Sequence, residues 1–254
     1  MENELSFVAI IPARYASTRF PGKPLADIKG RSMIQRVYEQ TVKAIDDVFV
    51  ATDDKRIFDV VEKFGGRVVM TSESHLSGTD RCAEAVATAE KESGRSFDAV
   101  LNVQGDEPFI DPQQLELIKS CFTADKDTQI ATLVKEINTQ EDMFNPNRPK
   151  VVLDHNYRAL YFSRTPIPYV RAEKTNNWVH AHRFYMHIGL YGFRKEILYA
   201  LTKLPQSSLE LAESLEQLRW IQNGYGITVR ITEYESFGVD TPEDLERLCN
   251  NFSG

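Results

Sequence analysis

The stretch FVAIIPARYASTRFPGKPL, residues 7–25, decides the fold class of this 254-residue chain. It opens with the apolar run Phe7–Ile11, which is typical of a strand covered on both faces, because a half-exposed strand would alternate with polar residues. Three cations follow closely: Arg14, Arg19 and Lys23. Positive charge at the mouth of a buried strand indicates a ligand that carries negative charge.

Strands and helices alternate through the first 125 residues. The segments DVFVATDD, RVVMT and DAVLNVQGDEP predict three further strands, and apolar residues at helical spacing predict helices over residues 32–44, 55–64 and 79–92. Asp53 or Asp54 can cap the second helix, and Pro112 can begin another. This alternation predicts an α/β fold with a doubly wound, mostly parallel sheet. Its ligands should bind at the edge where the strands end, so the loops after residues 11, 52, 71 and 103 should share one crevice.

The second half of the chain is richer in strands. Strands are predicted for QIATLVKEI, KVVLD, YRALYFSR, HIGLYGFR and ITVRITEY. One helix is predicted from Ser208 to about Asn223, and DTPEDLERL predicts another that begins with Thr241 as its cap. Because no repeat or linker interrupts the chain, we interpret residues 1–254 as a single domain with a strand-rich elaboration in its second half.

The composition excludes several classes of protein. A net charge of −7 argues against a general nucleic-acid binder. The longest apolar runs are far shorter than the roughly 20 residues that span a bilayer, and MENELS lacks the features of a signal peptide. We therefore expect a cytoplasmic protein without nucleic-acid or membrane partners. The three cysteines form neither a disulfide framework nor a zinc-binding spacing.

The loop after the first strand does not match the common phosphate-binding motifs. The segment PARYASTRFPGK has one glycine where a dinucleotide-binding turn needs three, and Lys23 is followed by proline rather than by the Ser or Thr of a Walker motif. Phosphates would therefore have to be held by cations and loop amides. Arg14, Arg19 and Lys23 could together meet a triphosphate.

Two acidic loop ends indicate a metal site. NVQGDEPFI supplies Asp106 at the end of the fourth strand, and FGVDTPEDL supplies Asp240. Two carboxylates suit Mg²⁺, which takes its other ligands from phosphates and water. Asp240 is equally well explained as part of an ordinary helix start. His187 could likewise be a packed core residue.

The predicted helix SLELAESLEQLR carries a polar stripe. Glu210, Glu213 and Gln217 stand at i, i+3 and i+7, which would suit a ligand with many hydroxyl groups. A plain amphipathic helix explains the same segment.

Taken together, these segments resemble the 3-deoxy-manno-octulosonate cytidylyltransferases, or CMP-KDO synthetases. The resemblance runs from about Phe7 to Leu248. It is carried by the segments IPARYASTRFPGKPL, VATDD, SGTDR, NVQGDEP, KVVLD, ALYFSR, HIGLYGFR, SSLELAESLEQLR and GVDTPEDLERL. A single segment such as RFPGKPL would indicate only a sugar nucleotidyltransferase.

The resemblance implies an enzyme that joins KDO to CMP from CTP and releases pyrophosphate, for lipopolysaccharide biosynthesis. It implies a CTP-binding half, residues 1–125, and a sugar-acid-binding and dimerisation half, residues 126–254, in a homodimer. Mg²⁺ would be held by Asp106 and Asp240, which with Arg14 and Lys23 would form the catalytic set. The nucleotide would contact Ala13, Arg14, Lys23, Ser77, Gly78, Arg81 and Gln104, and the sugar acid would contact Arg164, His187, Tyr191, Glu210 and Gln217.

Alternatives stay open at this point. A CMP-sialate synthetase, or a transferase for an amino-modified KDO, would carry similar motifs. A nucleotide-binding regulator that has lost catalysis is disfavoured, because both Asp106 and Asp240 are present. Arg164 could also brace the second half by pairing with Glu210 or Glu213 instead of binding a carboxylate.

Overall fold

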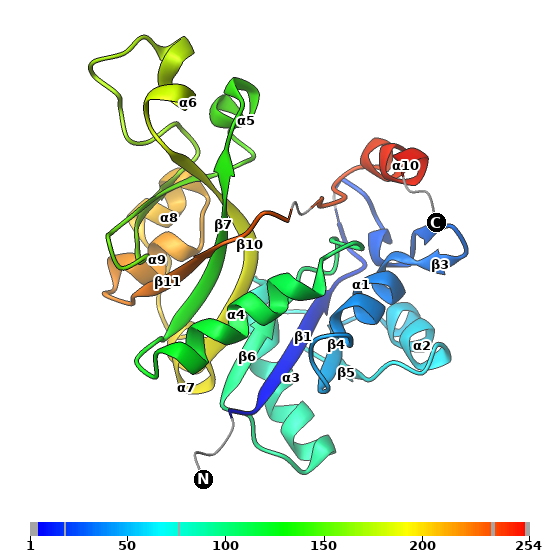
Figure 1. Cartoon of the computed structure of the whole chain (residues 1–254). Coiled ribbons are helices and arrows are strands. Elements are labelled where there is room, and N and C mark those ends of the chain that lie inside the picture. Colours follow the sequence, from blue (N-terminus) through cyan, green and yellow to red (C-terminus); the bar gives the residue numbers. More distant parts are fainter. Residues whose placement is uncertain (1–4, 18, 76, 235–236, 252–254) are drawn as a thin grey trace. The chain divides into compact units, whose positions relative to one another are not determined.

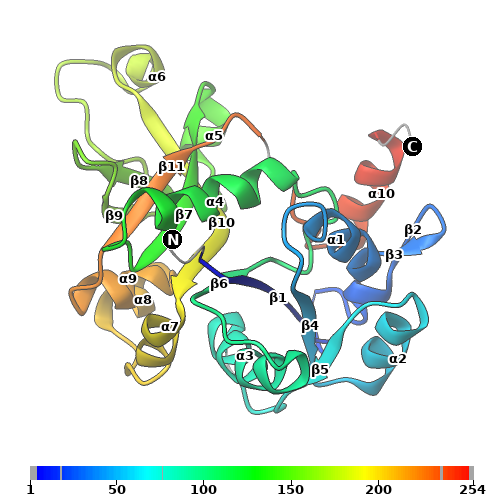
Figure 2. The same ribbon diagram turned by 60° about the horizontal axis from the view of Figure 1, so that its bottom comes forward.

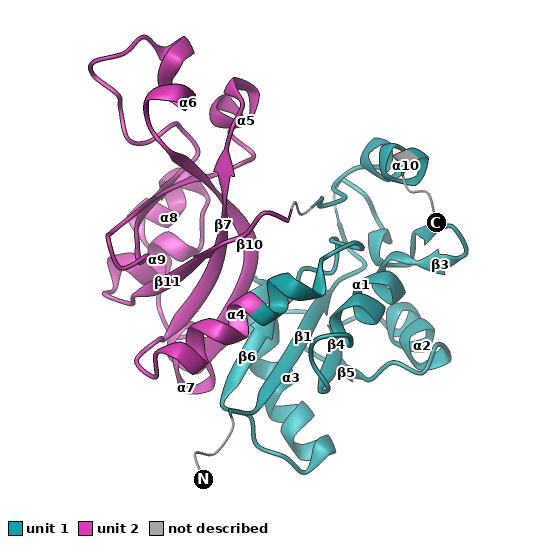
Figure 3. Cartoon of the chain, viewed as in Figure 1, with its two compact units in different colours: residues 1–116, 236–254 teal, residues 117–235 magenta. Residues whose placement is uncertain are grey.

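The computed structural model describes residues 5–17, 19–75, 77–234 and 237–251. The chain forms two compact units, shown in different colours in Figure 3: unit 1 is residues 1–116 with residues 236–254, and unit 2 is residues 117–235. The last segment of the chain therefore belongs with the first unit. The interpretation of the whole chain as one domain stays a prediction.

Unit 1 is built on four parallel strands, as the alternating pattern predicted. They are β1 (Phe7–Ala13), β4 (Val48–Thr52), β5 (Val68–Met70) and β6 (Ala99–Asn102). Their order is β6-β1-β4-β5, with all pairs parallel. Every residue of β4 and β6 is buried, which explains why these segments read as continuous apolar runs. The predicted α/β fold is confirmed.

The helices of unit 1 cover both faces of this sheet, with α1 and α3 on opposite sides (Figures 1 and 2). Three of them begin at capping residues that follow strand ends or turns. Ser32 caps α1 (Met33–Thr41), Asp54 caps α2 (Lys55–Lys63) and Ser77 caps α3 (Gly78–Ser93), each accepting a backbone N–H of the first turn. Of the two caps considered for α2, Asp54 is the one used.

Shorter elements complete the first part of the chain. They are the 3-10 turn η1 (Lys23–Leu25) and the two-stranded β2 (Asp27–Ile28) and β3 (Arg31–Ser32). Helix α4 (Pro112–Ala124) begins at Pro112, as predicted, and continues past the boundary between the units.

The chain returns to unit 1 at its end through α10 (Pro242–Asn251). Val239 is buried in an apolar cluster with Ile28 and Met33, and Leu245 packs against the same cluster. The Val239 N–H donates to the carbonyl of Asp106 at 2.9 Å. Apolar burial and one backbone bond thus fix the segment that carries Asp240 beside the loop after β6.

The described residues of unit 2 include five strands of mixed direction. They are β7 (Ile130–Ile137), β8 (Lys150–Leu153), β9 (Ala159–Ser163), β10 (Phe184–Arg194) and β11 (Ile227–Ile231). Strand β7 pairs parallel with β11 and antiparallel with β10, which pairs antiparallel with β8. Strands β8 and β9 form a hairpin, and Tyr157 takes a positive φ at its turn.

The predicted helix over residues 208–223 is wrong as a single element. It is two short helices, α8 (Ser208–Glu213) and α9 (Gln217–Gln222). Between them Ser214 adopts the left-handed conformation, with φ 51°, which ends the first helix. Because of this break, Glu210 and Gln217 do not lie on one continuous helical stripe.

Four short helical elements of unit 2 were not predicted from the sequence. They are α5 (Gln140–Phe144), η2 (Thr175–Asn177), α6 (Trp178–Ala181) and α7 (Lys195–Leu201). Each is too short to show a clear helical period. Among the residues that the structure describes, no helix combines the length and the apolar character needed to cross a bilayer.

Candidate active site

A pocket of about 270 Å³ opens in unit 1 where the loops after the parallel strands meet. It contains all nine residues that the family resemblance assigned to the nucleotide and the metal. These are Ala13, Arg14, Lys23, Ser77, Gly78, Arg81, Gln104, Asp106 and Asp240. The sequence predicted that the loops after four strands share one crevice. The structure confirms this for the loops after β1, β5 and β6, whereas no residue directly after β4 lines the pocket.

The backbone of two loops meets at the floor of the pocket. A Cβ on Gly105 would lie 2.8 Å from the carbonyl oxygen of Pro12, so no larger residue fits there without moving the backbone. This close approach brings the loop after β6 against the end of β1. It places Asp106 next to the cations of the opening stretch.

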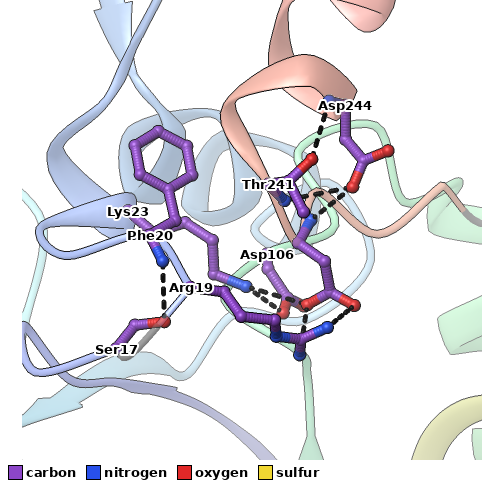
Figure 4. Close-up of polar contacts among 8 residues, drawn as sticks. Ser17, Arg19, Phe20, Lys23, Asp106, Thr241 and Asp244 are labelled. Carbon is purple, nitrogen blue, oxygen red and sulfur yellow. Dashed lines mark hydrogen bonds and ion pairs between the residues drawn. The ribbon is translucent and has the colours of Figure 1, made fainter.

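Four charged side chains form one network in the pocket (Figure 4). The Lys23 ammonium lies 2.7 Å from Asp106 Oδ2 and 3.5 Å from Asp240 Oδ1. Arg19 donates to both oxygens of Asp240, at 3.0 and 3.1 Å. The Lys23 side chain is only 14% exposed, so its charge lies in a partly desolvated position, where ion pairs are stronger than at the open surface.

Local structure explains how Lys23 and Asp240 reach this position. Gly22 takes φ 72° at the entry to η1, a conformation that favours glycine, and η1 begins with Lys23. Thr241 and Asp244 bond each other's backbone at the start of α10: the Asp244 N–H donates to Thr241 Oγ1 and the Thr241 N–H to Asp244 Oδ2. The predicted cap at Thr241 is therefore present, and Asp240 is both a helix-start residue and a pocket residue.

The two carboxylates fit a magnesium ion. Asp106 and Asp240 come from different loops, and both reach the same ammonium group of Lys23, so a single cation position is within range of both. Their oxygen atoms are the ligand type that Mg²⁺ prefers, and one or two carboxylates with phosphate oxygens are its usual set. Within the described part of the chain, no group of three or more His, Cys, Asp or Glu side chains forms an all-protein metal site.

The N-terminus of α3 also faces the pocket. Ser77 and Gly78 stand at the start of this helix of 16 residues, where backbone N–H groups favour an anion or an acceptor group. The pocket further contains Ser17 and His75, which were not assigned to the site from the sequence, and Arg19, which the sequence placed among the three cations for a triphosphate. Arg19 reaches the pocket with Arg14 and Lys23, as the closely spaced cations of the opening stretch predicted.

His187 and Tyr191 lie together in unit 2. Their rings are 5.2 Å apart, and the His187 ring also meets Phe162 edge-on at 5.1 Å. His187 Nε2 lies 3.0 Å from Thr132 Oγ1. Burial lowers the pKa of His187 to about 3, so the ring is neutral at physiological pH. Burial, and to a lesser degree the charge of Glu216, raises the pKa of Tyr191 well above its usual value.

The buried polar atoms around Tyr191 are poorly satisfied. Tyr191 packs edge-on against Trp220 of α9, with ring centroids 5.0 Å apart, and Gln217 of the same helix is 4% exposed. The Tyr191 hydroxyl, Gln217 Nε2 and Trp220 Nε1 have no hydrogen-bonding partner among the residues that the structure describes. Buried polar groups are normally paired, so this cluster suits a polar ligand.

The Glu210 carboxylate stabilises the start of its own helix. Its carboxylate accepts the Ser207 N–H at 3.1 Å in a capping box and lies 3.4 Å from Arg219 Nε. It is 8% exposed. Glu210 therefore organises α8 and α9 whether or not it also touches a ligand.

Arg164 is held by backbone carbonyl groups. Its guanidinium donates to the carbonyls of Glu213 at 2.6 Å, Pro146 at 2.9 Å and Ser214 at 3.1 Å. The Glu213 carboxylate accepts the Arg164 backbone N–H at 2.9 Å. The structure thus joins Arg164 to the turn between α8 and α9, through contacts that brace this region.

The chain is similar to known proteins over most of its length. Residues 8–231 match the family model described as Cytidylyltransferase. The 3-deoxy-manno-octulosonate cytidylyltransferase of Parabacteroides distasonis is 59% identical, with 96% of each chain covered, and that of Thermodesulfovibrio yellowstonii is 51% identical, with 97% of this chain and 99% of the other covered.

A solved structure described as CMP:2-keto-3-deoxy-manno-octonic acid synthetase complexed with CTP is also similar. It superposes with a TM-score of 0.88 at 40% identity, covering 96% of this chain and 97% of the other. The fold, the pocket at the strand ends and these full-length similarities lead to one conclusion. The chain belongs to the 3-deoxy-manno-octulosonate cytidylyltransferases, the CMP-KDO synthetases, within the cytidylyltransferase family.

Proposed function

We propose that this chain transfers the cytidylyl group of CTP to KDO and releases pyrophosphate, an activation step for lipopolysaccharide assembly. In this reaction the anomeric hydroxyl of the sugar acid attacks the α-phosphorus, and the bond from that phosphorus to the pyrophosphate oxygen breaks. The observation that carries the proposal is the charged network of one pocket. It joins Lys23, Asp106 and Asp240 from three separate segments.

The cations of the pocket would bind the triphosphate. Lys23 and Arg14 would pair with phosphate oxygens and hold them in line for attack. Arg19 holds Asp240 through two hydrogen bonds, which fixes the direction of that carboxylate. Ala13, Ser77, Gly78, Arg81 and Gln104 would contact the nucleoside.

Asp106 and Asp240 would hold Mg²⁺. When bound there, the ion would neutralise phosphate charge and favour ionisation of the attacking hydroxyl. Lys23 contacts both carboxylates, so the lysine would have to shift toward the phosphates when the ion binds. Measuring CTP affinity at increasing magnesium concentration, in wild type and in Asp106→Asn, would show whether the two carboxylates link CTP binding to magnesium. CTP affinity that is independent of magnesium in the wild type would contradict the site.

The sugar acid would bind in unit 2. The unsatisfied polar atoms of Tyr191 and Gln217, with His187 beside them, offer hydrogen bonds to hydroxyl groups. Glu210 and Arg164 belong to the same proposed set. The planar guanidinium of Arg164 suits a carboxylate, although it already donates hydrogen bonds to three backbone carbonyls.

The direct test is release of pyrophosphate from CTP in the presence of magnesium and each candidate sugar acid. KDO should support turnover, whereas a sialic acid or an amino-modified KDO should support much less. Turnover with a sialic acid that matches KDO would overturn the assignment of the substrate. Omission of the sugar acid is the control for CTP hydrolysis.

A second test concerns the nucleotide. CTP should be used well and ATP or GTP poorly, because a site lined by placed polar groups rejects bases that leave those groups unpaired. Comparable kcat/KM values for CTP and ATP would contradict a base-specific pocket.

A homodimer is also part of the proposal. Tyr169 is 73% exposed and Phe144 47% exposed, and both rings pack on the buried Trp178 in unit 2. Exposed aromatic residues of this kind are common in interfaces between subunits. Light scattering should give the mass of two chains, and Tyr169→Ser should weaken association. A monomer at micromolar concentration would exclude the dimer.

A further inference from the structure

Arg81 is a buried cation at the wall of the nucleotide pocket. It stands one turn into α3, lines the pocket and is only 4% exposed. Its Nη2 donates to Asp53 Oδ2 at 2.6 Å, and its Nη1 donates to the hydroxyl of Thr71. A guanidinium has five N–H groups, and these two bonds fix its plane.

The two partners stand behind Arg81, at the ends of neighbouring strands. Asp53 directly follows β4 and Thr71 directly follows β5. The strand ends are joined to each other, because the Thr71 N–H donates to the carbonyl of Thr52 at 2.8 Å. Neither Asp53 nor Thr71 lines the pocket. Both would influence a bound nucleotide only through Arg81.

The chemistry of the two pyrimidines makes the orientation of Arg81 important. Cytosine presents two adjacent acceptors, N3 and O2, whereas uracil presents an N3–H donor in place of the first acceptor. A guanidinium only donates, so it can pair with the cytosine edge and opposes the uracil donor. A guanidinium that could turn aside would lose this discrimination.

We propose that Asp53, supported by Thr71, is a positioning residue that fixes Arg81 so that the pocket selects cytosine over uracil. This inference rests on the proposed function, in which Arg81 contacts the nucleoside, and it places that contact at the base. It assigns a role to two residues that do not touch the substrate. Arg81 could turn away from the N3–H of uracil only by breaking its ion pair with Asp53. That would leave a charge buried and unpaired, so UTP binds less favourably than CTP.

The test is the ratio of CTP to UTP in both binding and turnover, for wild type, Asp53→Asn and Thr71→Val. Wild type should prefer CTP by about a hundredfold or more. Asp53→Asn removes the charge of the partner and should lower the ratio by about tenfold or more, the scale of a charged hydrogen bond. Thr71→Val keeps the shape and removes one acceptor, and should lower the ratio by about threefold.

Asp47→Asn is the matched control. Asp47 directly precedes β4, its side chain is 6% exposed, and it pairs with Arg67 and Arg95 at the opposite end of the strand. Asp47→Asn should lower the melting temperature, as Asp53→Asn should, and should leave the CTP to UTP ratio unchanged. An equal change in ratio for Asp47→Asn would show that general loosening is responsible, and would overturn the proposal.

The remaining outcomes are also decisive. An unchanged ratio in folded Asp53→Asn overturns the role of Asp53, and if that variant does not fold, an unchanged ratio in Thr71→Val overturns it. Equal binding of CTP and UTP to the wild type also overturns the proposed role of Asp53. Binding that prefers CTP without any pyrophosphate release would instead refute the proposed reaction, and would leave the role of Asp53 to be judged from the binding ratio.

Discussion

The two units treat polar side chains in opposite ways. In unit 1 the charges of the pocket are paired with one another: Lys23 with Asp106 and Asp240, and Arg19 with Asp240. In unit 2 the residues proposed for the sugar acid include neutral, buried groups, and the hydroxyl of Tyr191 lacks a partner among the described residues. One region is arranged for a highly charged ligand, the other for a ligand with many hydroxyl groups.

This difference separates two physical strategies. A charged network can exchange its internal pairs for pairs with phosphate or metal at modest net cost, because charge replaces charge. Buried neutral polar groups without partners cost stability in the free protein and regain it when a ligand supplies hydrogen bonds. Substitutions in the charged network of the unit 1 pocket should therefore affect mainly turnover, and substitutions in the polar cluster of unit 2 should affect both binding and stability.

The largest effect is expected at the carboxylates. Asp106→Asn and Asp240→Asn should each fold and should each lower kcat by about a hundredfold or more, because two negative charges are needed at one cation position. Steady-state pyrophosphate release at saturating CTP and KDO measures this. Asp111→Asn is the control: it retains an amide cap for the start of α4, where Asp111 accepts the Gln113 N–H, and should leave kcat unchanged. Activity like that of wild type in either pocket variant would remove the two-carboxylate site.

Arg164→Lys should show a mixed effect. Lysine cannot reach three carbonyls at once, so the free energy of unfolding should fall by about 1–3 kcal/mol. A carboxylate contact would additionally raise KM for KDO about tenfold or more, with little change in KM for CTP.

Because losing the bracing contacts lowers stability in either case, only the two KM values decide the role of Arg164. Unchanged KM values in a folded, less stable variant would make Arg164 a brace alone. The carboxylate of the sugar acid would then have to be bound elsewhere.

The pH dependence of unit 2 should depend on His187. Its pKa is lowered by burial from 6.5 to about 3, so below pH 6.5 the unfolded chain binds a proton that the folded chain does not. The contribution of the neutral ring is therefore fully present above pH 6.5 and is lost as the pH falls toward 3, by up to about 1.4 kcal/mol per pH unit.

Urea unfolding at pH 7, 6, 5 and 4 measures this slope, and His187→Gln should show a smaller one. Other groups titrate in both proteins, so the difference between wild type and variant is the informative quantity. Parallel curves would contradict a histidine that stays neutral in the folded chain.

The smallest effect is expected at Lys150. This side chain is fully buried, and its Nζ donates to the carbonyl of Asn145 at 2.9 Å. Burial, followed by the charge of Arg164, lowers its pKa to about 8. The folded chain therefore loses this proton at lower pH than the unfolded chain, and stability should rise as the pH increases from 8 to 10.5.

Lys150→Met should remove that rise and change stability at pH 7 by only about 1 kcal/mol, because an apolar residue of similar length avoids burying a charge. Unfolding curves at pH 7, 8, 9 and 10 measure both quantities. A loss of more than about 3 kcal/mol of stability at pH 7 would show that the Lys150 ammonium is an essential partner of the Asn145 carbonyl.

The fold of unit 1 and the convergence of its charged loop ends could be predicted from the sequence for a general reason. Buried parallel strands read as apolar runs, and their ends meet at one edge, so residues such as Lys23 and Asp106 converge whatever the details of their loops. The pairing of Arg19 with Asp240 could not be predicted, because the two residues are 221 positions apart and no local pattern links them.

Unit 2 was less predictable from the sequence. The apolar spacing of residues 208–223 fits one helix, and only the left-handed Ser214 shows that there are two. Serine has no special preference for that conformation, so tertiary contacts decide it, among them the bond from Arg164 to the Ser214 carbonyl. The contacts of Arg164 with three carbonyls likewise depend on tertiary structure.

The return of the chain to unit 1 has a consequence for biosynthesis. A ribosome makes the chain from its N-terminus, so Lys23 and Asp106 emerge long before Asp240, which lies in the segment that anchors through Val239. All of unit 2 is translated in between. A nascent chain can therefore fold much of its parallel sheet early, yet the second carboxylate of the pocket, Asp240, joins it only after all of unit 2 has been translated.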